Sequence, residues 1–357
     1  MGAYPNYLLD PSNVILDPAS AINVITVGSI AQSNGLDIHD EDYVDIQPIA
    51  NAGQPSPFTR VGTTQCIKPD LVDYGGTAVF IGVNQAVADG GQRPAAGIVT
   101  LDSEYLVRLF TTRSGTSFAS PLVAFKAAQL RTNFPDASAN LIRALLALSA
   151  EYPEGSRICT AGLSEDDRYS LLGYGQPKIE SALASDDNRV ILVAEDSLPI
   201  DKFAIYEVPI PEPFQTTAGE RQIRVALAFH PPVRHTRLDY AGVSMSFRLI
   251  RGSNQAEVFD AFTKWEKAKG AAPKLDDRFY CNMKPGPQRR ERGSLQCATF
   301  TAKKSLAEYG DRYFLAVRCE GGWAGQLVNE QRFALAVELR HAAQIDLYRR
   351  IRVRLRA

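Results

Sequence analysis

The chain has 357 residues, a formal net charge of −1, 45% hydrophobic residues and 22% charged residues. This balance is typical of a folded globular protein, and it excludes a protein drawn to nucleic acid or acidic membranes by its overall charge. The length suffices for one large domain and a second, smaller one.

No apolar run approaches the roughly 20 residues that cross a bilayer. The first 30 residues also lack the basic stretch and apolar core of a secretory leader. The five cysteines are odd in number, widely scattered and without a C-x-x-C spacing, so they predict neither a disulfide framework nor a zinc site. We therefore expect a cytoplasmic protein with reduced thiols, no membrane association, no metal and no cofactor.

The first third of the chain alternates short strands with polar turns. Residues 21–30 are rich in β-branched side chains, which predicts a short buried strand of a parallel sheet. Residues 31–57 are polar, acidic and turn-rich, and are typical of a surface excursion. Residues 78–81 and 105–110 predict two further strands around a glycine-rich loop.

Residues 114–121 read SGTSFASP and lead into an apolar run. Such small residues carry a chain sharply into a helix, so Ser117 stands where the first backbone N–H groups are free. A hydroxyl there can attack a carbonyl while a backbone donor receives the negative charge that develops on the oxygen. The alternative is structural, because a lone Gly-Thr-Ser also serves as a helix N-cap.

The helix that starts at this turn is predicted to end near Thr132, since a proline follows at position 135. A second helix is predicted over residues 141–150, with Leu141, Leu145 and Leu148 on one face. A short helix through Leu183 closes this half of the chain.

Residues 186–188 make a plausible domain boundary, beyond which the hydrophobic pattern changes to a period of two. This pattern predicts a β-sandwich. Its expected strands are 190–193, 203–206, 222–229, 243–250, 313–317, 333–339 and 350–356. The stretch 256–292 interrupts it with a predicted helix over 256–269 and a basic, flexible loop over 285–292.

The last predicted strand alternates arginine with Ile, Val and Leu. We interpret it as an edge strand whose arginines deter pairing with another sheet. A contact with nucleic acid or an acidic partner is the alternative, to which Arg289, Arg290 and Arg292 could add. No aromatic residues are interleaved with the arginines of this strand, so nucleic acid is not expected as a partner.

The string GTSFASP at a helix start resembles the serine motif of the subtilisin-like serine peptidases. Three other landmarks resemble segments of the same family in the same order. They are the strand at 23–29, the elements at 56–62 and 67–76, and the segment at 174–179. Asp73-Tyr74 replaces the Ala-Pro that is usual in the second landmark.

The resemblance covers residues 14–185 and implies an α/β fold. We expect a subtilisin-like parallel sheet with flanking helices, incomplete at its N-terminus, over residues 1–185. An all-β sandwich domain follows over 186–357, with the insertion at about 256–292. A parallel sheet cut through its middle exposes an unpaired strand edge and apolar faces.

The resemblance also implies the chemistry. In this family the triad runs Asp, His, Ser along the chain, so Ser117 would be the nucleophile that forms an acyl-enzyme, with its own N–H as one oxyanion donor. Only His39 precedes it, and we interpret His39 as a solvated loop residue because it lacks the family's Gly-Thr context. The aspartate motif is absent, and Asn6 and Asn13 lack the setting of the oxyanion asparagine.

We therefore expect a serine endopeptidase by family that is inactive as this chain alone and works with an N-terminal complementing fragment on protein or peptide substrates. A second hypothesis is a non-catalytic binding or regulatory module, in which the sandwich recognises a partner. Residues 227–242 also resemble the sandwich of bacterial intracellular subtilases encoded beside an AAA-type ATPase, which implies such an ATPase as a partner.

His230 and His235 flank a proline-rich loop in this stretch. A metal would need more converging ligands, and Asp239 is more simply explained by pairing with Arg237 or Arg234. We therefore predict no metal site here.

Overall fold

The computed structural model describes residues 4–35, 45–63, 66–90, 95–252, 254–268, 275, 277–306 and 312–354. They form two compact units, one of residues 1–133 with 149–179 and one of residues 134–148 with 180–357. The chain therefore leaves the first unit after the serine helix, contributes one helix to the second unit and returns. No helix in the described ranges is both long and apolar enough to cross a lipid bilayer.

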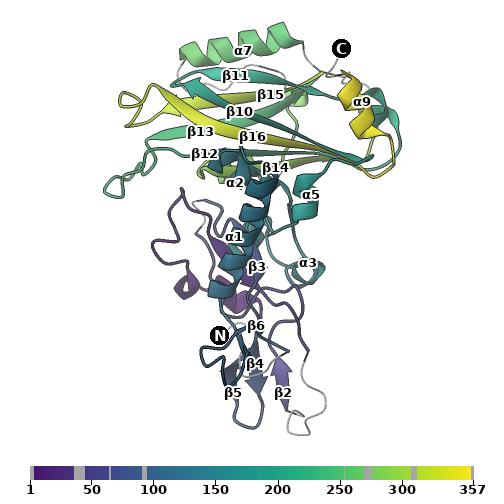
Figure 1. Ribbon diagram of the computed structural model, residues 1–357. Helices are drawn as coiled ribbons and strands as arrows, with labels where there is room; N and C mark the ends of the chain where they lie inside the picture. The colour runs from purple at the N-terminus through teal and green to yellow at the C-terminus, as the bar shows by residue number, and fades with distance from the viewer. Residues whose placement is uncertain are drawn as a thin grey trace. The chain divides into compact units, whose positions relative to one another are not determined.

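The first unit consists of one long helix and a series of short strands (Figure 1). Its elements are η1 (Asn6–Leu9), η2 (Pro11–Asn13), β1 (Val27–Ile30), β2 (Ile46–Pro48), β3 (Leu71–Tyr74), β4 (Ala78–Ile81), β5 (Ala86–Asp89), β6 (Ile98–Leu101), β7 (Phe110–Arg113), α1 (Thr116–Asn133), β8 (Ala150–Glu151), α3 (Glu154–Cys159), α4 (Glu165–Leu172) and β9 (Gln176–Pro177).

The predicted strand at 21–30 is confirmed for its second part. Of the strands that the structure describes, only β1 and β3 pair in parallel, with Val27 opposite Leu71 and Ile30 opposite Tyr74. The remaining pairs, β2 with β4, β4 with β5, β6 with β7 and β8 with β9, are antiparallel. Helix α1 packs on both parallel strands and ends within one residue of its predicted end.

The predicted strand at 105–110 is wrong. Its residues up to 107 lie in turns, and β7 begins only at Phe110. The Asp102 carboxylate accepts hydrogen bonds from the Glu104 N–H at 2.9 Å and from the Arg108 guanidinium. An aspartate that bonds to the backbone two residues on favours a turn over an extended strand, whatever the apolar content of the next residues.

The second unit holds the longer strands. Its elements are α2 (Ala139–Leu148), α5 (Ile179–Leu183, of which Ile179 counts with the first unit), β10 (Arg189–Pro199), β11 (Phe203–Pro209), α6 (Glu212–Thr216), β12 (Arg221–Phe229), β13 (Val243–Arg251), α7 (Gln255–Ala268), η5 (Asp277–Phe279), α8 (Pro287–Arg290), β14 (Leu295–Ala302), β15 (Arg312–Gly321), β16 (Glu330–His341) and α9 (Leu347–Arg354).

Two antiparallel sheets share one apolar core in this unit. One sheet has the order β10-β16-β12-β14 and the other the order β11-β15-β13. Alternate side chains from both sheets, such as Val225, Phe247, Leu315 and Leu335, belong to a single buried cluster. The period-two pattern read from the sequence is the signature of strands with one buried face. Strand β14 lies where the sequence analysis predicts none.

Helix α2 covers the four-stranded sheet, and all of residues 141–148 are buried. The Arg143 guanidinium donates to the Phe229 carbonyl at 2.9 Å and to the Ser294 hydroxyl at 2.8 Å. In return, Arg224 on β12 donates to the Ala147 carbonyl at 3.0 Å. Polar contacts therefore fix α2 at both ends of its apolar face.

The basic loop predicted at 285–292 is also wrong, because α8 forms there and buries two of its arginines. The Arg290 guanidinium stacks 4.3 Å from the Phe247 ring centroid and donates to the carbonyls of Phe247 and Pro285. These arginines serve the interior of the unit, which removes Arg289 and Arg290 from a surface that could bind an acidic partner.

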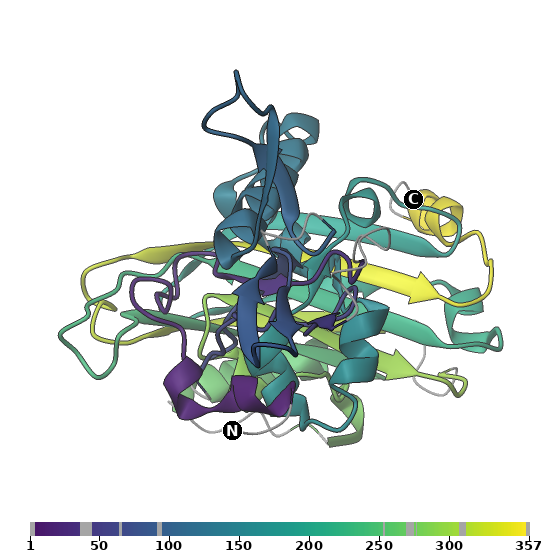
Figure 2. The same ribbon diagram turned by 90° about the horizontal axis from the view of Figure 1, so that it is seen from below.

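The predicted edge strand at 350–356 is a helix instead, α9, drawn in yellow beside the label C (Figures 1 and 2). Leu347 and Ile351 lie four residues apart on one helical face and are both buried in the core of the unit. The alternation of charge and apolar residues fits a strand, but the need to bury these two side chains together selects the helix.

His341 lies at the end of β16, buried against the Phe214 ring, and its Nδ1 accepts a hydrogen bond from the Ala343 N–H at 3.0 Å. Burial and the neighbouring Arg221 guanidinium lower the pKa of His341. Arg221 is itself buried, and it donates to the carbonyls of Gln215, Thr217 and Gly219. The folded unit therefore holds a neutral histidine beside a buried cation.

We predict that the second unit loses stability as the pH falls below about 6.5, the ordinary pKa of histidine. The unfolded chain then binds a proton that folded His341 does not bind. Protonation therefore lowers the free energy of the unfolded state relative to the folded state. The variant His341→Asn keeps an acceptor for the Ala343 N–H and should have a urea midpoint that changes less between pH 7.5 and 5.5. The exposed control His235→Gln should keep the wild-type pH dependence, and an equal slope in all three proteins would contradict this account.

Candidate active site

Ser117 is the second residue of α1, and its side chain is exposed. The N–H groups of Thr116 and Ser117 belong to the first helical turn, where no intrahelical acceptor exists. Pro121 lacks the N–H that would otherwise bond to the Ser117 carbonyl one turn earlier. The structure therefore places Ser117 at a helix start, as the sequence predicts, and leaves it exposed to solvent.

The turn before Ser117 is fastened to the end of β3. The Gly115 N–H donates to the Gly75 carbonyl at 2.8 Å, and the Ser114 hydroxyl donates to the Thr77 carbonyl at 3.1 Å. A side chain at position 75 would overlap the Ser29 hydroxyl and lie 2.6 Å from the Gly115 carbonyl oxygen. Glycine is therefore required where the two segments approach each other.

A chain of buried hydroxyls lies beneath this approach. The Ser56 hydroxyl donates to the Gly76 carbonyl at 2.6 Å, so the Ser29 hydroxyl, 2.7 Å away, donates to Ser56. The Ser29 N–H donates in turn to the Thr59 hydroxyl at 3.0 Å. Because Ser29, Ser56 and Thr59 are buried, each of these bonds is costly to break.

A buried ion pair lies in the same region. Lys68 and Asp70 side chains are 5% and 4% exposed, with 2.6 Å between Nζ and the carboxylate. The Asp70 carboxylate also accepts from the Thr26 N–H at 2.8 Å, and Lys68 donates to the Val24 carbonyl at 2.7 Å. Both charged residues of the Lys-Pro-Asp segment thus join the chain before β1 to the start of β3.

Asp73 makes a second ion pair, and this one reaches the serine helix. Its side chain is 1% exposed, and its carboxylate lies 2.6 Å from Lys126 Nζ on α1. The same carboxylate accepts from the Gln176 side-chain amide and the Tyr74 N–H, both at 2.9 Å. The family that this segment resembles has alanine at the position of Asp73. This chain therefore has a buried carboxylate in place of an apolar side chain, and Lys126 provides its counter-charge.

The sequence landmarks therefore meet around one turn. Ser29 comes from the first, Ser56 and Thr59 from the second, Asp73 and Gly75 from the Lys-Pro-Asp-Gly region, and Gln176 from the last. Sequence reasoning missed the roles of Asp73 and Lys126, although the departure from Ala-Pro was a signal. A spacing of 53 residues between them hides the pairing.

The described residues of the first unit include no histidine that could act as a general base for Ser117. His39 lies outside the described residues. His230, His235 and His341 belong to the second unit. Asn13 donates from its side-chain amide to the Tyr7 carbonyl at 2.9 Å, which is a local turn contact, and Asn6 lies in η1.

The loop with His230 and His235 is organised around Trp323. Arg234 and Arg237 lie 4.5 and 5.7 Å from its ring centroid, and Arg237 pairs with Asp239 at 3.2 Å as the sequence predicts. Across the described ranges, no group of three His, Cys, Asp or Glu side chains could hold a metal ion.

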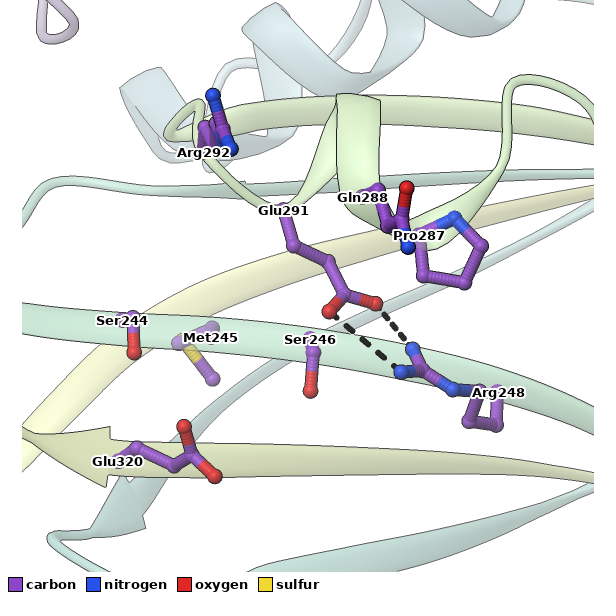
Figure 3. A pocket seen from close by; sticks show the side chains of 9 residues that line it. All are labelled: Ser244, Met245, Ser246, Arg248, Pro287, Gln288, Glu291, Arg292 and Glu320. Atoms are coloured by element: carbon purple, nitrogen blue, oxygen red, sulfur yellow. Dashed lines mark hydrogen bonds and ion pairs between the residues drawn. The ribbon is translucent and has the colours of Figure 1, made fainter. Parts of the chain in front are cut away.

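The second unit has a polar hollow of about 620 Å³ between β13 and α8 (Figure 3). Ser244, Ser246 and Arg248 line it from one strand, and Arg248 forms an ion pair with Glu291 across it. This pairing cancels the two central charges. None of the residues that line the hollow belongs to the landmarks around Ser117.

We predict that Asp73→Asn loosens α1 by about 3 kcal/mol, because it leaves Lys126 largely buried without its counter-charge. Hydrogen exchange of peptides from α1 measures this as faster local opening. The control Arg108→Met opens the exposed pair with Asp102, whose arginine is 65% exposed, and should leave exchange in α1 unchanged. Equal protection of α1 in Asp73→Asn and the wild type would refute the role of this pair.

Comparisons with known proteins agree with this arrangement of landmarks. The model of the subtilase family matches residues 9–175. The protein y4bN of Sinorhizobium fredii is 50% identical over 356 residues, which span 99% of this chain and 82% of y4bN. A solved chain of Tomato aspermy virus matches 45% of this chain and 81% of its own length, with 12% identity and a TM-score of 0.22, too low to carry an argument about fold.

The matched range 9–175 contains the landmark strand, the Lys-Pro-Asp segment and the serine turn, and it ends one residue before Gln176. Residues 9–175 are therefore a segment of the subtilase family, and the chain shares nearly its whole length with y4bN.

Proposed function

We propose that this chain carries the nucleophile of a subtilisin-like serine endopeptidase, with Ser117 as the residue that is acylated. The observation that carries the proposal is an exposed serine at the N-terminus of α1, where backbone and side-chain bonds to residues 73–77 hold the turn and the helix. We also infer that β1 and β3 belong to a subtilisin-like parallel sheet flanked by α1, and that the second unit is a β-sandwich.

The reaction would begin when the Ser117 hydroxyl oxygen attacks the carbonyl carbon of a peptide bond. The free N–H groups of the first turn of α1 would stabilise the oxyanion that forms. The serine proton must pass to a base and then to the leaving amine, which departs as the acyl-enzyme forms. Water then hydrolyses the ester and restores the hydroxyl.

The described residues of the first unit include no histidine that could accept the proton of Ser117. We infer that a further polypeptide segment, bearing the family's Asp and His motifs, completes the site. The surface of α1 supports this inference, because the helix is rich in Ala, Leu, Val and Phe on all sides. A helix of that composition is normally covered, yet Phe125 is 61% exposed. Without the base we expect at least about 10³-fold less acylation of Ser117.

A non-catalytic binding or regulatory role is the second candidate. The observation in its favour is that the described histidines all lie in the second unit, away from the landmarks of the serine turn in sequence. An AAA-type ATPase partner and a cytoplasmic location stay predictions.

A fluorophosphonate probe tests the proposal. We expect weak or no labelling of the chain alone, and strong labelling after addition of a subtilase fragment that carries the Asp and His motifs. Ser117→Ala should abolish that labelling. Ser120→Ala removes an exposed hydroxyl three residues further along the same helix and should leave it intact.

Two outcomes would contradict the proposal. Strong labelling of the chain alone at Ser117 would overturn the predicted inactivity. Labelling that survives Ser117→Ala would show that another residue reacts, and it would remove Ser117 as the nucleophile.

A further inference from the structure

The hairpin of β6 and β7, here called the arm (residues 98–113), carries an unusual density of exposed apolar side chains. Seven of its residues between 99 and 110 are more than half exposed. They are Val99, Leu101, Tyr105, Leu106, Val107, Leu109 and Phe110, at 63, 67, 62, 88, 85, 53 and 57%.

The strand pairing places part of this set on one face. Leu101 lies directly opposite Phe110, and Val99 lies opposite Thr112. Side chains at such positions point to the same side of a hairpin. One face of the arm thus presents Val99, Leu101 and Phe110 together.

The connecting turn is fixed by its own contacts. Asp102 accepts from the Glu104 N–H and pairs with Arg108, and the N–H groups of Val107 and Arg108 both donate to the Glu104 carbonyl, at 2.8 and 3.0 Å. The exposed Leu106 and Val107 are therefore held at the tip of an ordered turn.

The arm is a sheet of two strands only. Within the described strands, β6 and β7 pair only with each other. A two-stranded hairpin is marginally stable in water unless further strands or a packed face support it.

The apolar surface is large for a single hairpin. Taking roughly 150–250 Å² for an aromatic side chain, Tyr105 and Phe110 together expose roughly 180–300 Å². The five exposed Val and Leu side chains add to this area, so the arm reaches the roughly 300–600 Å² of the largest apolar patch on a typical monomer. Patches of that size often serve as interaction sites.

We propose that the arm binds the arm of a second copy of this chain, an inference that goes beyond the proposed function and does not depend on it. The acidic Asp102 and Glu104 balance the basic Arg108 and Arg113, so the arm has no net charge that would select a charged partner. The chain itself carries only −1, so two copies barely repel each other. Identical patches meet in a two-fold dimer, the commonest symmetry of homo-oligomers.

Sedimentation velocity of the full chain across micromolar concentrations tests the dimer. The wild type should sediment as a species of twice the chain mass of 39.1 kDa. The double variant Leu106→Asp, Val107→Asp should sediment at the mass of one chain, because it buries carboxylates in the paired arms. These exposed positions leave the fold intact, which circular dichroism checks.

Two single variants are matched controls. Val83→Asp and Leu238→Asp change apolar residues that are 81% and fully exposed but lie outside the arm, and both should remain dimeric. Hydrogen exchange of residues 98–113 should be slow in the wild type and at least about tenfold faster in the double variant. A monomeric wild type, a dimer that persists in the double variant, or aggregates of undefined mass would each overturn the proposal.

Discussion

The close approach of Gly75 and Gly115 is the contact on which the serine turn depends. One backbone hydrogen bond of 2.8 Å joins the end of β3 to the start of α1, and no side chain fits at position 75. The buried Ser29 and Ser56 hydroxyls hold the segment below this contact, and the Asp73–Lys126 pair fixes α1 further along its length. The direction in which Ser117 points follows from these restraints.

Different kinds of contact stabilise the two units. The second unit buries a broad apolar cluster between two sheets. The first unit has only small apolar clusters in its described part, and it relies on buried polar contacts such as Lys68 with Asp70. Buried ion pairs and hydroxyl chains specify a geometry more than they add stability. A unit built in this way can hold the serine turn accurately while still exposing apolar surface on α1 and on the arm.

Arginine in this chain often acts as an internal donor. Arg143, Arg221 and Arg290 are buried, and each donates to backbone carbonyls. The guanidinium keeps its charge but offers five N–H groups in fixed directions, and its stem packs against apolar neighbours. A run of basic residues therefore did not indicate a basic surface, because Arg290 also donates to the Phe247 carbonyl on a strand distant in sequence.

Local sequence was enough for the elements whose pattern and burial agree. The helix start beside Ser117, the end of α1 near Thr132 and most strands of the second unit follow from small residues, proline and the period of two. Long-range contacts decided the rest. Leu347 and Ile351 reach the core only as a helix, and Asp73 meets Lys126 across 53 residues. Spacing along a chain cannot reveal such partners, since burial and charge pairing are settled only when distant segments meet.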